Sequence, residues 1–124
     1  MEPTKYVALA EDDDALRLLL ATTLRRAGYR VREFSSGSQL LRTLAPPALC
    51  VDLVISDIRM PGASGLEVLA KLHREDKTVP VVLMTAFGDH STHERALELG
   101  AAALIDKPFE LDELLSLADR LTHH

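Results

Sequence analysis

Several acidic residues, a threonine and a lysine in this sequence could together bind a metal ion and a phosphate. Glu11 and Asp12 follow one apolar segment, and Asp57, Thr85 and Lys107 each follow another. Clustered carboxylates repel one another unless a cation neutralises them. A hard ion such as Mg²⁺ suits such a cluster, because it takes one or two carboxylates, waters and a phosphate oxygen. A hydroxyl and an ammonium group beside it would complete a site for a phosphoryl group.

Each of these residues also has an ordinary structural interpretation. An acidic run before a helix often supplies the N-cap, and Asp13 or Asp14 is expected to do so. A lone aspartate such as Asp57 commonly begins a turn. Thr85 at the end of a strand is typical β-branched filling, and Lys107 alone is typical of a solvated surface charge. The functional interpretation therefore depends on whether the fold brings these residues to one place.

Short apolar segments alternate with helical patterns along the whole chain. The predicted strands cover residues 6–10, 29–34, 53–56, 79–84 and 102–105. Helices are predicted between and after them, at 16–27, 38–44, 66–73, 91–99 and 111–121. Gly28 and Gly100 are placed to end two helices, and Pro46-Pro47 to end a third. The last helix has the clearest amphipathic stripe.

This order predicts an α/β fold, a three-layer (βα)5 arrangement in which helices cover both faces of a doubly wound parallel sheet. Right-handed crossovers leave few ways to wind it. Segment 29–34 alternates apolar and charged residues, which favours an edge strand. In such sheets the reactive crevice lies beyond the carboxyl ends of the strands. Without a linker or repeat in the sequence, residues 1–124 are expected to form a single domain.

Composition narrows the class of protein. Hydrophobic residues make up 47% and charged residues 27%, which is typical of a soluble globular chain. The net charge of −5 argues against direct binding of nucleic acid. No apolar run is long enough for a membrane span, and the start does not resemble a signal peptide. The single cysteine, Cys50, suits a reducing compartment, so a cytoplasmic location is expected.

Taken together, the motifs resemble the receiver domain of bacterial two-component response regulators. The resemblance rests on Glu11-Asp12, on residues 56–61 with Gly65, on 84–86 and on 107–109. It covers essentially the whole chain, from residue 6 to residue 121. It implies the flavodoxin-like strand order 2-1-3-4-5.

The resemblance also implies a Mg²⁺ site, in which Mn²⁺ can substitute. Asp12 and Asp57 would be carboxylate ligands, and Glu11 would hold a coordinated water. The backbone carbonyl of Arg59 would supply a further ligand.

For Asp57, the resemblance implies phosphorylation by a sensor histidine kinase or a phosphotransfer protein. Aspartate carboxyls are ionised near neutral pH, so the attack needs no general base. Thr85 would hydrogen-bond the phosphoryl group, and Lys107, before a cis peptide bond to Pro108, would pair with its charge. Hydrolysis would later reset the switch, so the chain would catalyse only its own phosphorylation and dephosphorylation and is not expected to be an enzyme.

In this family the signal passes through the fourth helix, the fifth strand and the fifth helix. An aromatic residue usually stands three positions before the lysine, but here that residue is Leu104. Leu104 either changes how the signal is passed on or simply fills a core position. Arg59 and Phe87 are predicted to tune the lifetime of phosphorylated Asp57, although Phe87 could instead pack against the fourth helix.

Other functions remain alternatives. An interaction module that no longer needs phosphate would explain Leu104. A hydrolase with an aspartyl-phosphate intermediate would instead carry its nucleophile after the first strand, and a flavin-binding protein would have a Ser/Thr/Gly-rich first loop. The sequence leaves open a homodimer, the output partner, and whether the receiver stands alone or is part of a longer regulator.

Overall fold

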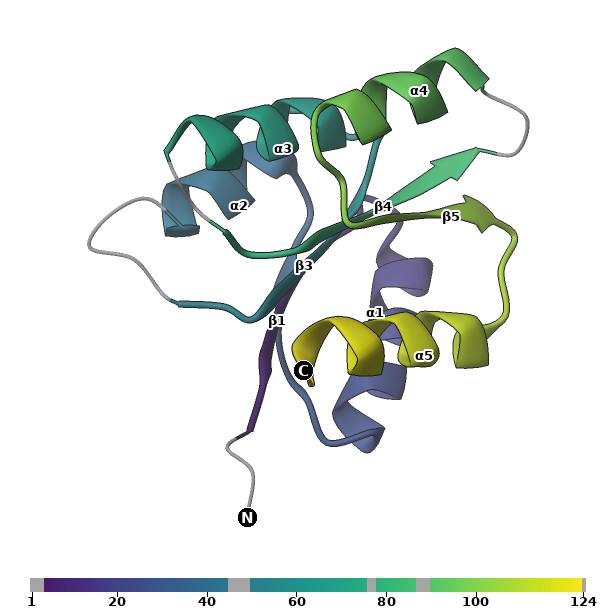
Figure 1. The fold of residues 1–124 in the computed structure, drawn as a ribbon. Helices are drawn as coiled ribbons and strands as arrows, with labels where there is room; N and C mark the ends of the chain where they lie inside the picture. The colour runs from purple at the N-terminus through teal and green to yellow at the C-terminus, as the bar shows by residue number, and fades with distance from the viewer. Residues whose placement is uncertain (1–3, 45–49, 76–77, 87–89, 124) are drawn as a thin grey trace.

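The computed structural model describes residues 4–44, 50–75, 78–86 and 90–123. Strands and helices alternate along these residues, as Figure 1 shows. The elements are β1 (Tyr6–Ala10), α1 (Asp14–Arg26), β2 (Arg30–Phe34), α2 (Gly37–Leu44), β3 (Leu53–Asp57), α3 (Gly65–Arg74), β4 (Val81–Ala86), α4 (His90–Glu98), β5 (Ala103–Lys107) and α5 (Leu111–Thr122). The alternating pattern predicted from the sequence is thus confirmed.

The strands form one parallel sheet in the order β2-β1-β3-β4-β5. This confirms both the flavodoxin-like order and the edge position of β2. The chain changes direction across the sheet at β1, between β2 and β3. The carboxyl ends of β1 and β3 are therefore neighbours, and this is the point where such sheets bind ligands.

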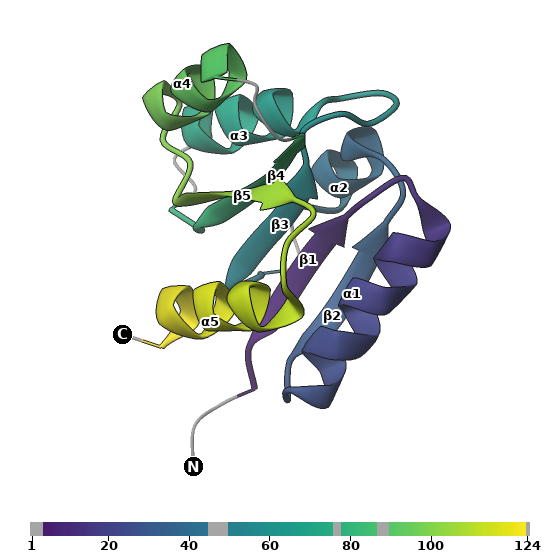
Figure 2. The ribbon, with the colours of Figure 1, turned by 90° about the vertical axis from the view of Figure 1, so that its right-hand side faces the viewer.

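Helices cover both faces of the sheet. Figure 2 shows α1 and α5 on one face, with α2, α3 and α4 on the other. Each face has its own apolar core, centred on Leu20 and Leu114 on the first face and on Leu40 and Leu69 on the second. Fully burying a leucine side chain contributes roughly 1.5–3 kcal/mol, so these two cores hold the strand ends in a fixed relation.

Local capping fixes where two helices begin. The Asp13 carboxylate accepts a hydrogen bond from the backbone N–H of Leu16, which confirms Asp13 as the N-cap of α1. Ser64 and Glu67 form a capping box at the start of α3. Both helices thereby start immediately after the loops that follow β1 and β3.

Two strands end later than the sequence predicts. β4 continues to Ala86 and β5 to Lys107, so Thr85 and Lys107 belong to the ends of strands and do not follow them. The peptide bond between Lys107 and Pro108 is cis, as predicted. Pro46, Pro47 and Phe87 lie outside the described residues. None of the helices in the described part of the chain has the length and apolar composition that a membrane crossing requires.

Candidate functional site

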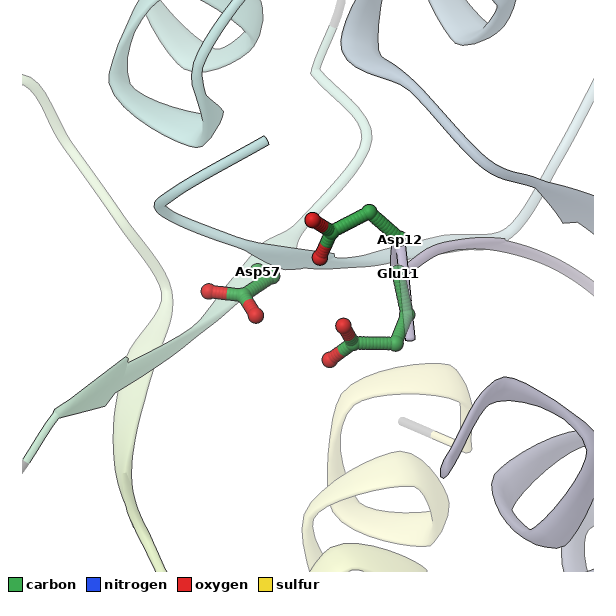
Figure 3. A group of neighbouring side chains, drawn as sticks. All are labelled: Glu11, Asp12 and Asp57. Carbon is green, nitrogen blue, oxygen red and sulfur yellow. The ribbon is translucent and has the colours of Figure 1, made fainter. Parts of the chain in front are cut away.

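Three carboxylates converge where β1 and β3 end. Glu11 and Asp12 follow β1, and Asp57 is the last residue of β3 (Figure 3). One oxygen from each carboxylate lies within 4.8 Å of the others. Glu11 and Asp57 are buried, whereas Asp12 is exposed. The cluster therefore opens to solvent through Asp12.

Backbone hydrogen bonds hold Glu11 in place. Its N–H donates to the carbonyl of Phe34 (3.0 Å), which extends the pairing of β1 with β2 by one residue. The backbone N–H of Asp13 donates to Glu11 Oε2 (3.0 Å). Arg17 Nη1 donates to the Glu11 carbonyl (2.8 Å), so the first turns of α1 also fix this loop.

Lys107 reaches across the sheet edge from the end of β5. Its Nζ donates to Asp57 Oδ2 (2.5 Å) and to Glu11 Oε1 (2.8 Å). Burial alone would lower the pKa of Lys107, but the hydrogen bonds to these two carboxylates outweigh it, and the pKa is raised. Burial raises the pKa of Glu11 despite the hydrogen bond from Lys107. One cation thus partly offsets two of the three clustered acids.

The loop after β3 aims the Asp57 carboxylate. The backbone N–H of Arg59 donates to Asp57 Oδ1 (3.1 Å), while the Arg59 side chain is exposed. Gly65 brings the start of α3 against this loop, because its N–H donates to the carbonyl of Ile58 (2.9 Å). A Cβ at Gly65 would lie 2.6 Å from the Asp57 carbonyl oxygen, so only glycine allows this approach.

Thr85 is buried and lies in a polar group that the sequence did not predict. Its hydroxyl donates to Asp106 Oδ1 (2.7 Å), and His93 Nε2 lies 2.9 Å from both the hydroxyl oxygen and Asp106 Oδ1. The register of β4 and β5 places Thr85 opposite Asp106. A register argument could have found Asp106, but nothing in the sequence indicates His93.

Three of the predicted site residues line the same pocket. Asp57, Thr85 and Lys107 line a cavity of 610 Å³, together with apolar side chains that include Leu19 and Phe109. The structure therefore brings the side chains of five predicted residues to one edge of the sheet: Glu11, Asp12, Asp57, Thr85 and Lys107. Leu104, in contrast, is half-buried and packs against the core beneath α2, α3 and α4.

The donor set fits a divalent metal ion. Hard cations such as Mg²⁺ take carboxylate and carbonyl oxygens, and the cluster of Glu11, Asp12 and Asp57 offers only oxygen ligands. Lys107 pairs with Glu11 and Asp57, and a bound cation would add positive charge beside three carboxylates. The described residues of this cluster could thus hold a metal ion.

Comparison with known proteins identifies the family. The model of the response regulator receiver domain matches residues 7–119 of this chain. The chain therefore belongs to the response regulator receiver domain family and is the receiver domain of a two-component response regulator.

Two curated relatives illustrate the similarity. The chain is 35% identical over 118 residues to the DNA-binding transcriptional regulator NtrC of Escherichia coli (strain K12). It is 40% identical over 117 residues to the C4-dicarboxylate transport transcriptional regulatory protein DctD of Pseudomonas aeruginosa. These alignments cover 95% and 92% of this chain but 25% and 24% of the relatives. The chain thus spans about a quarter of their length.

A solved structure agrees with this assignment. The non-phosphorylated HemR receiver domain of Leptospira biflexa superposes with a TM-score of 0.87 at 31% identity, covering 98% of this chain and 96% of that one.

Proposed function

We propose that Asp57 accepts a phosphoryl group from a phosphohistidine on a sensor histidine kinase or a phosphotransfer protein. The observation that carries the proposal is the bridge from Lys107 Nζ to Asp57 and Glu11, beside the exposed Asp12. It combines a nucleophilic carboxylate, a fixed cation and free access from solvent. Cytoplasm is the proposed compartment, where such a partner would meet the chain.

Each residue then has a defined task. An Asp57 oxygen attacks phosphorus as the phosphorus–nitrogen bond breaks, and the departing imidazole retains the electron pair of that bond. Lys107 pairs with the charge that gathers on the transferred group, and Thr85 donates a hydrogen bond to it. The Arg59 N–H fixes the orientation of the Asp57 carboxylate. Water later attacks the acyl phosphate and returns Asp57 to its free form.

Glu11, Asp12 and Asp57, with the backbone carbonyl of Arg59, are the residues proposed to hold Mg²⁺. When bound, the ion supplies positive charge that stabilises the oxygens of the transferred group. Lys107 already performs part of this charge compensation between two of the acids. Because Lys107 contacts Asp57 and a bound ion would share its carboxylate, we expect the rate of phosphorylation to depend on both.

For the output, we propose a change on the face formed by α4, β5 and α5. NtrC and DctD are named as transcriptional regulators, and we include control of transcription, through a linked or partner DNA-binding region, in the proposal. In that arrangement the described domain itself has no need to bind DNA, which agrees with its net charge of −5.

The test is phosphorylation of the purified chain by acetyl phosphate, with and without Mg²⁺, followed by intact mass measurement. We expect the wild type to gain one phosphoryl group only with Mg²⁺ and Asp57→Asn to gain none. Asp14→Asn is the matched control, because Asp14 is an exposed acid close to the cluster that pairs with Arg17 instead. Phosphorylation of Asp57→Asn would reject the acceptor assignment.

A second function, an interaction module independent of phosphate, is favoured by Leu104 alone. It predicts that a partner binds the wild type and Asp57→Asn equally well. Absence of phosphorylation from acetyl phosphate and from a phosphohistidine donor, together with such binding, would support it over the leading proposal.

A further inference from the structure

A closed polar group joins three elements next to the candidate site. His93 comes from α4, Thr85 from β4 and Asp106 from β5. Three contacts close the group: Thr85 Oγ1 to Asp106 Oδ1 at 2.7 Å, His93 Nε2 to Thr85 Oγ1 at 2.9 Å, and His93 Nε2 to Asp106 Oδ1 at 2.9 Å. Thr85 is almost fully buried, whereas His93 and Asp106 are partly exposed. The group therefore connects the floor of the site with the surface of α4.

The hydrogen-bond roles follow from the groups themselves. A threonine hydroxyl has one proton, and Thr85 donates it to Asp106. The Thr85 oxygen is then an acceptor, as is the Asp106 carboxylate, so His93 Nε2 carries a hydrogen that faces both. This differs from a nucleophile–histidine–acid relay, in which the acid holds the other ring nitrogen. The arrangement holds the hydroxyl and does not activate it.

His93 lies on a helix that has few buried side chains of its own. Every residue of α4 is described, and Ala96 alone among them is buried. Leu97, on the same helix, has 61% of its surface exposed. Beside the apolar contact of Ala96, His93 therefore supplies a polar contact between α4 and the ends of β4 and β5.

We propose that His93 is a positioning residue which, with Asp106, holds the Thr85 hydroxyl in the unphosphorylated state. This rests on the proposed function, in which Thr85 donates a hydrogen bond to the phosphoryl group on Asp57. Since Thr85 has one proton, that donation breaks its bond to Asp106 and opens the polar group. Because the hydroxyl must also turn toward the phosphoryl group, its oxygen moves away from His93 Nε2, which keeps its contact with Asp106. Phosphorylation thereby weakens the contact of α4 with β4.

The test measures the affinity of beryllofluoride, a phosphoryl mimic, by titration calorimetry with Mg²⁺. His93→Ala removes the hold on Thr85, so we expect beryllofluoride to bind about five-fold more tightly, the effect of one net hydrogen bond. His93→Gln keeps an N–H donor near the position of Nε2 and should restore affinity close to wild type. Glu94→Ala, at an exposed neighbour on the same helix, should leave affinity unchanged.

Three further measurements separate positioning from a general effect on the fold. Asp106→Ala should tighten binding in the same direction, which provides a second route if His93→Ala folds poorly. In a Thr85→Ala background, His93→Ala should have no additional effect. In the free protein, amide hydrogen exchange in α4 should be faster in His93→Ala than in the wild type.

Unchanged or weaker beryllofluoride binding in both His93→Ala and Asp106→Ala, with wild-type binding that depends on Asp57, would overturn this inference and leave the proposed function intact. An additional effect of His93→Ala in the Thr85→Ala background would also overturn it. Failure of the wild type to bind beryllofluoride would overturn the proposed function, and the role of His93 with it.

Discussion

Lys107 Nζ lies 2.5 Å from Asp57 Oδ2, so the proposed acceptor already carries a fixed cation. The same nitrogen lies 2.8 Å from Glu11 Oε1 and joins the ends of three strands that are distant in the sequence. Removing one member of a charged pair leaves the other without compensation, which is the larger part of the cost. The Lys107 bridge therefore serves both stability and the proposed chemistry.

Replacing Lys107 with Met should separate these two effects. Without Mg²⁺ we expect the free energy of unfolding to fall by about 1–3 kcal/mol, because two buried carboxylates lose their partner. Saturating Mg²⁺ should recover most of this stability, since the ion supplies the missing charge. Phosphorylation by acetyl phosphate should remain at least about ten-fold slower. Denaturant unfolding with and without Mg²⁺ measures the stability, and intact mass against time measures the rate of phosphorylation. Equal phosphorylation rates in Lys107→Met and the wild type would show that Lys107 has no part in the proposed chemistry.

Mg²⁺ should stabilise the folded chain through the acidic cluster. At a concentration roughly ten times its Kd, an ion that binds only the folded state adds roughly 1.4 kcal/mol. Asp12→Asn should lose most of this gain, because Asp12 is the exposed member of the cluster. Thermal unfolding at increasing Mg²⁺ concentrations measures this increase in stability. Asp14→Asn is the control and should show the same increase as the wild type. An equal gain in Asp12→Asn would place the ion elsewhere.

Gly65→Ala should damage the site through the backbone. The added Cβ would meet the Asp57 carbonyl oxygen at 2.6 Å and Ile58 Cα at 2.9 Å. We expect a loss of about 1–3 kcal/mol and slower phosphorylation, because the loop after β3 must shift. Gly28→Ala is the contrasting variant: φ of +102° strains an alanine there, but its Cβ meets nothing within 4 Å. It should lose stability while its phosphorylation rate stays at the wild-type value.

Tyr29 should make stability depend on alkaline pH. Burial raises its pKa, and the hydrogen bond that its hydroxyl donates to Asp119 Oδ1 (2.6 Å) raises it further. A folded-state pKa above the unfolded value of about 10 stabilises the protein below that pH, and this contribution is lost as pH rises through the folded-state pKa. Tyr29→Phe should therefore show a smaller decline in unfolding free energy at alkaline pH.

Tyrosinate absorbance in a Tyr6→Phe variant checks the cause, because Tyr29 is then the one tyrosine left. We expect its midpoint to lie above that of the same protein in denaturant. Coincident midpoints would show that folding does not perturb this phenol.

The sequence by itself determined the order of the elements and which strand ends carry polar groups. Apolar segments separated by amphipathic helices indicate a parallel sheet, and parallel strands present their carboxyl ends at one edge. This reasoning was sufficient to select Glu11, Asp12, Asp57, Thr85 and Lys107. It placed the ends of β4 and β5 too early, because a polar side chain at the end of a strand, such as that of Thr85 or Lys107, resembles the start of a loop although both residues pair within the sheet.

Only the tertiary structure decided which of these side chains contact one another. The bridge from Lys107 to Glu11 and Asp57 depends on strand neighbours that sequence spacing does not encode. The same holds for His93, whose contact with Thr85 requires the position and rotation of α4 over β4 and β5. A helical pattern gives the face that is buried, but packing against the sheet sets where one polar side chain on that helix comes to lie.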